Sequence, residues 1–260
     1  MTTSSVITLL TDFGTADYFA GAVKGAILSV NPHAVIVDIT QEIPPQDVET
    51  GAFMLLAAYQ TFPPGTIHVA VVDPGVGSSR RPIVVSANEQ FFVGPDNGLF
   101  TYIYDREPAH KTYHVTAAEY FRPSPSSTFH GRDIFAPVAA ALSNGVKPEQ
   151  LGPAINDEVR LPQSLESPMR IIHIDRFGNC VTNIGREAFE GKIESLRING
   201  TSVGNFRNFY GEDSSPAPFA IWGSAGFLEI SVNGGSAAKK LNVKRNDEVF
   251  LTQRRSGATD

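Results

Sequence analysis

The first 72 residues alternate between short apolar runs and segments with helical periodicity, and this alternation permits few architectures. Apolar runs of strand length occupy Val6–Leu10, Ala34–Ile39 and Ile67–Val72. Between them, hydrophobic side chains recur every three or four residues in Phe19–Val30 and in Val48–Thr61, which predicts two helices. Strands that are apolar along most of their length are buried on both faces. The pattern therefore predicts an α/β fold with a largely parallel sheet between layers of helices.

The sequence changes character after Pro168, where helical periodicity nearly disappears. Short runs of β type follow, separated by Gly, Asn and Asp: Arg170–Ile174, Cys180–Ile184, Ser195–Ile198, Phe219–Trp222, Phe227–Val232 and Glu248–Thr252. Such spacing is typical of a sandwich or a barrel. We expect an N-terminal α/β/α layered domain over residues 1–160 and a smaller, barrel-like all-β domain over residues 168–260. The Pro-rich, aperiodic segment 152–167 predicts a linker between them.

Composition narrows the class of protein. Hydrophobic residues make up 42% of the chain and charged residues 18%, so a packed core is expected rather than disorder. The net charge of −6 disfavours nucleic acid as a partner. The single cysteine, Cys180, excludes an internal disulfide and a multi-cysteine metal site. The opening residues resemble neither a signal peptide nor a membrane anchor, so we expect a cytoplasmic protein with no membrane partner.

The third apolar run leads into the segment that most strongly suggests chemistry. Ile67–Val72 ends on Asp73, and a loop rich in Gly and Ser then leads to Arg80. Open α/β sheets place their ligands at the carboxyl ends of strands, where a carboxylate beside a guanidinium can orient a water molecule. The alternative interpretation is structural: Asp73 opens a turn and Arg80 is a surface cation.

Three more residues of the N-terminal part are candidates. His130 precedes a predicted helix at 134–142 in a polar stretch, where it could transfer a proton or simply hold a loop. Asp12 follows the first strand and could accept hydrogen bonds from sugar hydroxyls. Asp17 lies on the other side of this strand–helix junction, and a helix cap is its simpler interpretation. The segment lacks the glycines of a GxGxxG loop, which argues against a pyrophosphate site.

In the C-terminal part, turn residues carry the candidates. Asp175, Phe177 and Asn179 lie between two predicted strands, where a flat aromatic ring and an amide could bind a base; a plain hairpin turn is equally compatible. Ser224 lies in a second turn and is weak evidence alone. The chain contains no Walker loop. It also has no HExxH motif and no cluster of His and Cys residues, so we expect no metal site.

Seven stretches, in order from about residue 7 to residue 250, together resemble one known family. They are TDFGTADYFAGAVKGAI, EIPPQDVETGAF, VVDPGVGSSRR, VGPDNGLF, TFHGRDIFAPVAA, IDRFGNCVTNI and WGSAGFLEISVNGGSAA. In register, they resemble the S-adenosyl-L-methionine (SAM) hydroxide adenosyltransferases, also called SAM hydrolases, which are related to the SAM-dependent fluorinase and chlorinase. The resemblance covers nearly the whole chain.

The resemblance implies hydrolysis of SAM to adenosine and L-methionine by attack of water or hydroxide on the ribose C5′. SAM is then the substrate, and no cofactor is implied. A homotrimer is also implied, with each SAM site between the N-terminal domain of one subunit and the C-terminal domain of the next. The water-handling triad would be Asp73, Arg80 and His130. Because Arg80 stays protonated, either Asp73 or His130 would be the base.

The same resemblance assigns substrate contacts. It implies that Asp12 holds the ribose hydroxyls and that Asp17 lies near the methionine end. Further implied contacts are Asp175 and Ser224 to the amino-acid moiety, Phe177 and Asn179 to adenine, and the backbone of Asn233 and Gly234 facing adenine, with Phe209 or Tyr210 as an aromatic wall.

Departures from the halogenating relatives favour water as the nucleophile. The fluorinase has Tyr in place of Asp73, Ser in place of Gly131 and Trp in place of Gln46. A carboxylate in the nucleophile pocket would repel a halide ion, whereas it can accept a hydrogen bond from water. Ala225 replaces an Arg of the relative, so another group must hold the substrate carboxylate. A chlorinase-like halide adenosyltransferase and a non-catalytic SAM- or adenosine-binding protein remain the alternatives.

Overall fold

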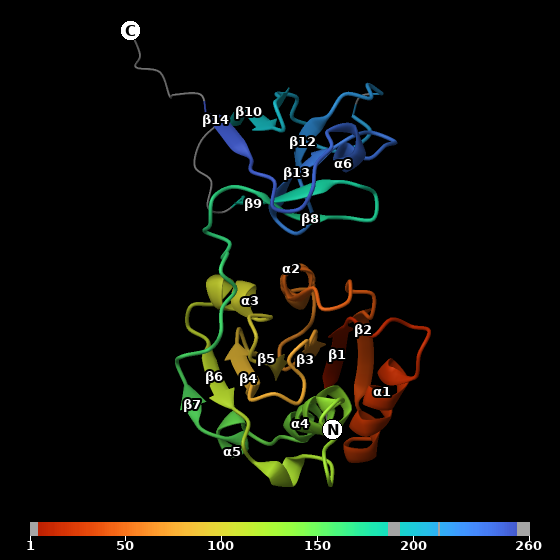
Figure 1. Ribbon diagram of the computed structural model, residues 1–260, viewed down its shortest axis with the longest axis vertical. Helices are drawn as coiled ribbons and strands as arrows, with labels where there is room; N and C mark the ends of the chain where they lie inside the picture. The colour runs from red at the N-terminus through yellow and green to blue at the C-terminus, as the bar shows by residue number, and fades with distance from the viewer. Residues whose placement is uncertain (1–4, 187–192, 213, 254–260) are drawn as a thin grey trace. The chain divides into compact units, whose positions relative to one another are not determined.

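The computed structural model describes residues 5–186, 193–212 and 214–253 (Figure 1). The chain divides into two compact units, Met1–Ser164 (unit 1) and Leu165–Asp260 (unit 2). Unit 1 is a mixed α/β unit with parallel strands at its centre, and the sheets of unit 2 are antiparallel. The predicted fold class is therefore confirmed.

A seven-stranded sheet of order β2-β1-β3-β5-β4-β6-β7 forms the centre of unit 1. Its strands are β1 (Val6–Thr11), β2 (Val35–Thr40), β3 (Ile67–Val71), β4 (Pro82–Ala87), β5 (Gln90–Pro95), β6 (Lys111–His114) and β7 (Ala154–Ile155). In this order, the first four strands, β2, β1, β3 and β5, pair in parallel, as the apolar runs predict. Strands β4 and β5 form a hairpin and are therefore antiparallel. The pairs β4–β6 and β6–β7 are antiparallel as well.

Helices cover both faces of this sheet. They are α1 (Phe19–Val30), α2 (Val48–Tyr59), α3 (Thr101–Arg106), α4 (Ala136–Ser143) and α5 (Pro148–Leu151), with short turns η1 (Ala118–Tyr120) and η2 (Gly131–Phe135). Helices α1 and α4 pack against each other, and α4 packs on β1 and β3 (Figure 1). The α1 and α2 crossovers run in opposite directions along the sheet, which places α2 on the other face when both are right-handed.

A glycine, Gly51, lets α2 pack closely on its neighbours. A Cβ at Gly51 would lie 2.8 Å from Leu99 Cδ1 and 3.1 Å from Val72 Cγ2. The N-terminus of α2 is capped by Asp47, whose Oδ1 accepts a hydrogen bond from Thr50 N at 3.1 Å, as its position in the sequence predicts.

Two local interpretations require correction. The cap residue of α1 is Tyr18, and no side chain caps this end, so the capping role considered for Asp17 is wrong. The helix expected to begin near residue 134 starts earlier, as the π-helical turn η2 over Gly131–Phe135 followed by α4. Periodicity alone does not reveal a π turn, because one added residue shifts the apolar face.

Residues 152–164, within the segment expected to be a linker, are held on unit 1. Strand β7 pairs with β6 there. Arg81 donates to the Asp157 carboxylate at 2.8 Å, and Val159 N donates to Asp96 Oδ1 at 2.8 Å. These contacts fasten the end of unit 1 beside the start of β4.

Unit 2 contains two antiparallel sheets that share one core. The first sheet has the order β12-β13-β9-β8 and the second the order β11-β10-β14. Their strands are β8 (Ile171–Ile174), β9 (Cys180–Gly185), β10 (Ile193–Ile198), β11 (Thr201–Val203), β12 (Phe219–Trp222), β13 (Phe227–Ser231) and β14 (Phe250–Gln253). The short helix α6 (Ala237–Lys240) follows β13. Apolar side chains from both sheets, such as Leu228 and Leu196, form the core. No helix in the described part of the chain is long and apolar enough to cross a membrane.

Candidate active site

The loop of residues 72–81 crosses the end of a strand. Strand β3 ends at Val71, and the next strand along the chain is β4. In the sheet, however, β5 lies between β3 and β4. The loop therefore passes over the carboxyl end of β5, with Asp73 at its start and Arg80 near its finish. Asp12 follows the adjacent strand β1, which runs parallel to β3. The chain leaves β1 toward β2 on one side of the sheet and leaves β3 toward β4 on the other. Open α/β sheets bind ligands at such a switch point, and both acids lie there.

Arg80 joins the predicted catalytic residues into one cluster. Its Nε donates to Asp73 Oδ1 at 2.9 Å, and its Nη2 donates to Asp73 Oδ2. The same Nη2 lies 2.8 Å from His130 Nδ1. The side chains of Arg80 and Asp73 are 8% and 5% exposed, and the guanidinium carbon lies 5.1 Å from the centre of the Phe135 ring. A bidentate pair this buried holds the carboxylate in a fixed orientation.

This geometry fixes the protonation state of His130. A guanidinium can only donate hydrogen bonds, so Nδ1 of His130 must accept and cannot carry a proton. The remaining proton of the neutral ring is then on Nε2. Burial lowers the pKa of His130, and the positive charge of Arg80 lowers it further, against opposing effects of Asp73 and Asp133. The neutral Nε2–H tautomer is therefore the resting form, and it presents a hydrogen-bond donor.

The segment before η2 is fastened on two sides. The buried carboxylate of Asp133 accepts hydrogen bonds from Ser126 N at 2.9 Å and from Arg132 Nε at 2.7 Å. On the other side, Gly77 adopts φ +78°, and a Cβ there would lie 2.2 Å from Ser127 O. The 72–81 loop, which carries Arg80, therefore packs closely on the residues that precede His130.

A hollow of about 260 Å³ opens beside this cluster and is termed the unit 1 hollow. It is lined by Asp12, Phe13, Gln46, Val71, Asp73, Pro74, Val76, Thr128, Phe129, His130 and Gly131. Asp12 Oδ2 accepts a hydrogen bond from Gln46 N at 2.8 Å, and Gln46 has the unusual φ of +65°. Asp17 is exposed and lies outside this lining.

A second hollow, of about 680 Å³, belongs to unit 2 and is termed the unit 2 hollow. It brings together all the residues that the sequence predicted in this half: Asp175, Phe177, Asn179, Ser224, Asn233 and Gly234. Of the two candidate aromatic walls, Tyr210 lines it and Phe209 does not. The hollow follows β13 from the turn at 223–226 to the turn at 232–235.

Asp175 organises the turn between β8 and β9. Its Oδ1 accepts hydrogen bonds from Phe177 N at 2.9 Å and Asn179 N at 2.8 Å, and its Oδ2 accepts from Asn179 Nδ2 at 2.8 Å. Phe177 is left 76% exposed at the tip of this turn. An exposed ring held on a tight turn is a ready surface for stacking a base.

Sequence reasoning missed Glu229, which also lines the unit 2 hollow. It lies on β13 and is 8% exposed, and its Oε2 accepts a hydrogen bond from the Tyr210 hydroxyl at 2.9 Å. Burial raises the pKa of Glu229, and the nearby Asp175 carboxylate raises it further, while the Tyr210 bond opposes this. The signal was present in the sequence: a lone acid within the apolar run FLEIS.

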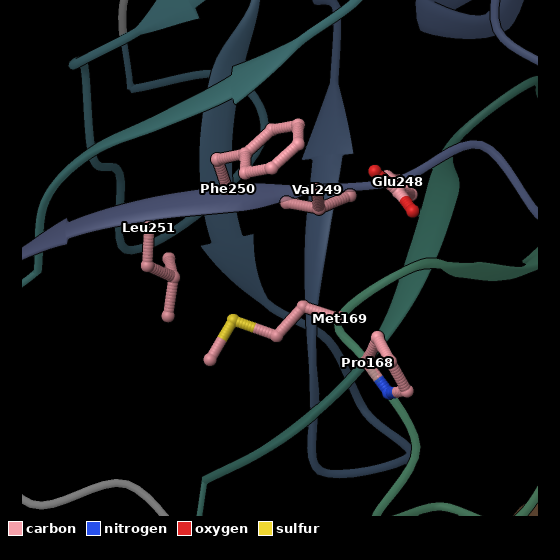
Figure 2. Close-up of a pocket in the computed structure, with 6 residues that line it drawn as sticks. All are labelled: Pro168, Met169, Glu248, Val249, Phe250 and Leu251. Carbon is pink, nitrogen blue, oxygen red and sulfur yellow. The ribbon is translucent and has the colours of Figure 1, made fainter.

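A third hollow, beside β14, offers little for chemistry. Its lining is Pro168, Met169, Glu248, Val249, Phe250 and Leu251, with Phe250 and Leu251 on opposite sides of the strand (Figure 2). Glu248 is its one ionisable residue. In the described ranges no group of three or more His, Cys, Asp and Glu side chains is placed to hold a metal ion.

Comparison with family models gives two matches that follow the two units. The model of the SAM hydroxide adenosyltransferase N-terminal domain matches residues 7–152, and that of the C-terminal domain matches residues 169–250. The chain belongs to this family. The resemblance seen in the seven sequence stretches is thereby confirmed.

Relatives in the family include curated hydrolases. A protein of Thermus thermophilus named (R)-S-adenosyl-L-methionine hydrolase is 39% identical, covering 93% of this chain and 97% of the relative. One of the same name from Methanocaldococcus jannaschii is 40% identical, covering 95% of each. A fluorinase of an Actinoplanes species is more distant, at 26% identity over 95% of this chain and 97% of the relative.

Solved structures share the fold. The crystal structure of an uncharacterized conserved protein from Thermotoga maritima has a TM-score of 0.88 at 35% identity, covering 95% of this chain and all of that one. A conserved hypothetical protein from Thermus thermophilus has a TM-score of 0.79 at the same identity and the same coverage.

Proposed function

We propose that this chain hydrolyses (R)-S-adenosyl-L-methionine to adenosine and L-methionine. The relatives named hydrolase are similar to it over almost its entire length, which supports this reaction. The observation that carries the proposal is the single guanidinium of Arg80, hydrogen-bonded to both Asp73 and His130 beside a hollow at the switch point. The prefix in the relatives' name specifies the configuration at the sulfonium, so we include this stereochemistry in the proposal.

The reaction is a substitution at carbon. A water oxygen forms a bond to the ribose C5′ while the bond from C5′ to the sulfonium sulfur breaks. Sulfur keeps the electron pair and leaves as the neutral thioether of methionine, and the water gives up one proton. Because the leaving group loses its charge as the bond breaks, the protein needs chiefly to position the water in line and to accept its proton.

We assign the proton to Asp73. Each Asp73 oxygen accepts one bond from Arg80 and keeps acceptor capacity for a water molecule. His130 is unsuited to this role, because its Nδ1 already accepts from Arg80 and its Nε2 carries a hydrogen. Its Nε2–H can instead donate to the water oxygen and so help to aim a lone pair at C5′. Arg80 positions both side chains.

The remaining roles concern the substrate. On unit 1, Asp12 Oδ2 is engaged by Gln46 N, so its other oxygen can accept from the ribose hydroxyls. On unit 2, Phe177 would stack on adenine with Asn179 beside it, and Asp175 and Ser224 would contact the amino-acid moiety. The backbone of residues 233–234 would face the adenine edge. The role of Asp17 stays a prediction.

We also propose the homotrimer. The water-handling cluster belongs to unit 1 and the aromatic and amide groups to unit 2, so a complete site needs both kinds of hollow. Mixing Asp73→Asn subunits with Asn179→Ala subunits under conditions that allow exchange tests the arrangement. Partial recovery of activity is expected if sites form between subunits, and no recovery despite demonstrated exchange would contradict it. The cytoplasmic location stays a prediction.

The test of function is a product assay. Purified protein is incubated with each sulfonium diastereomer of SAM in halide-free buffer, and adenosine and methionine are followed by chromatography. Equimolar products from the (R) form, lost in Asp73→Asn, are expected. No adenosine above the Asp73→Asn background would exclude the hydrolase. Dominant 5′-chloro-5′-deoxyadenosine in added chloride would favour the halide alternative, and stoichiometric ligand in calorimetry without turnover would favour a binding protein.

A further inference from the structure

Glu229 is a carboxylate in an unusual position. It lies within the buried strand β13, and only 8% of its surface is exposed. Acidic side chains are rarely buried to this degree unless a positive charge or several hydrogen bonds compensate them. Among the described residues, no Lys, Arg or His forms an ion pair with Glu229. Its carboxylate nevertheless lines the unit 2 hollow, where a ligand can reach it.

The hydrogen bonding of Glu229 leaves one oxygen available. Burial and the interaction with Glu229 raise the pKa of Tyr210 to about 12, so its hydroxyl keeps its proton and donates to Oε2. The Oε1 atom has no donor within the part of the chain that the structure describes. Asp175 differs, because three donors from its own turn engage its carboxylate. Glu229 is thus the acid of this hollow with the larger unused capacity to accept hydrogen bonds.

The position of Oε1 is set by a glycine. A Cβ at Gly223 would lie 1.8 Å from Glu229 Oε1 and 2.3 Å from its Cδ. The carboxylate therefore packs directly on the turn at 223–226, next to Ser224. This places Oε1 at the same end of the hollow as the turn that carries Ser224, whereas the adenine-side residues Phe177 and Asn179 belong to a different turn.

We propose that Glu229 binds the α-ammonium group of the methionyl part of SAM. This inference rests on the proposed function. An ammonium group offers three donors and a full positive charge, which suits a buried carboxylate oxygen that lacks a partner. The sulfonium carries charge but has no hydrogen to donate, and the adenine amino group is neutral. Glu229 is thus a substrate-positioning residue that selects an amino acid at this end of the ligand.

The test pairs Glu229→Gln with SAM analogues that differ only at the methionyl end. For SAM, we expect the variant to raise KM about 10- to 100-fold, the value of a charge-assisted hydrogen bond, with kcat changed much less. Decarboxylated SAM keeps the amine, so the same rise is expected. For an analogue that keeps the carboxylate but lacks the α-amino group, wild type and variant should have equal KM within about two-fold.

Two further variants separate binding from folding. Gly223→Ala displaces the Glu229 carboxylate and should raise KM for SAM in the wild-type background, but add little to Glu229→Ala. Glu194→Gln, which removes an exposed carboxylate of β10, is the matched control and should leave KM unchanged. Adenosine has no methionyl part, so its dissociation constant by calorimetry should be unaffected by Glu229→Gln.

The outcomes distinguish this inference from the proposed function. If the wild type hydrolyses SAM and Glu229→Gln leaves KM unchanged, the inference is overturned and the proposed function stands. An equal rise in KM for the analogue without the amino group, or weaker adenosine binding, would show that Glu229 merely supports the hollow and would also overturn it. If the wild type does not hydrolyse SAM, the proposed function fails, and the dissociation constants of SAM and its deaminated analogue still decide the role of Glu229.

Discussion

Acidification should destabilise unit 1 through one buried histidine, His68 of β3. Its Nδ1 lies 2.7 Å from Thr8 Oγ1 and its Nε2 lies 3.2 Å from Gln90 Oε1. The amide nitrogen of Gln90 donates to Phe62 O at 2.9 Å, so its oxygen faces the ring and Nε2 carries the hydrogen. The ring also stacks on Phe92 with centroids 4.9 Å apart. The neutral imidazole is therefore satisfied, and no carboxylate among these neighbours stabilises a positive charge.

The magnitude follows from the change in pKa. Burial lowers the pKa of His68 from 6.5 to about 4, against a smaller opposing effect of the Gln90 bond. The folded state binds the proton less tightly than the unfolded state, so stability is full above pH 6.5 and is lost as pH falls. At ~1.4 kcal/mol per pH unit, the loss reaches ~3 kcal/mol near pH 4, of which ~2 kcal/mol falls between pH 7 and pH 5.

The assay is urea unfolding of the wild type and of His68→Gln at several pH values between 7 and 5. Far-UV circular dichroism reports both units, whereas the single tryptophan, Trp222, reports unit 2 and serves as an internal reference. The difference in unfolding free energy between wild type and variant should shrink by about 2 kcal/mol as the pH falls from 7 to 5. A difference that stays constant within about 0.5 kcal/mol would refute a buried, neutral His68.

Three further predictions concern the candidate active site. Arg80→Lys should lower kcat at least about 100-fold with little change in KM, because an ammonium cannot hold both Asp73 oxygens and His130 at once; steady-state kinetics measures this. Since His130 must be neutral and its pKa is lowered, kcat/KM should stay level down to pH 6.5 and fall only below it, and an acid limb at higher pH would contradict the assigned tautomer. Gly77→Ala should lower both the melting temperature and kcat, because its Cβ would meet Ser127 O at 2.2 Å in a backbone with positive φ. An unchanged kcat would show that this contact does not set the geometry of Asp73, Arg80 and His130.

Periodicity predicted the centre of unit 1 because the spacing of apolar residues within each segment is enough to indicate a strand or a helix. The apolar runs that became β1, β2 and β3 pair in parallel, and Asp47 caps α2. Strands β1 and β3 are buried, whereas β2, at the edge of the sheet, is partly exposed. The antiparallel half of the sheet was harder to predict. Strand β6 is of mixed polarity and β7 is only two residues long, so both take their places from pairing with distant partners, which no local pattern encodes.

The site was predictable where polar residues follow strands and unpredictable where they lie within them. Asp12 and Asp73 are visible as acids at strand ends. Glu229 escaped because its neighbours on β13 are apolar, and its contact with Tyr210 joins residues nineteen positions apart. The exposure of Asp17 likewise depends on where the chain turns before α1, which the spacing of acids does not determine.

The passage of the 72–81 loop over the end of β5 has a consequence for evolution. Its two ends are anchored in β3 and β4, strands that are not sheet neighbours, so Asp73 and Arg80 lie outside the strand pairings of the sheet. In the proposed mechanism, the residue that handles the nucleophile therefore belongs to this loop and not to a strand of the sheet. A lineage can replace the side chain at position 73 and adopt another nucleophile while inheriting the same sheet, which fits the presence of hydrolases and fluorinases among the relatives of this chain.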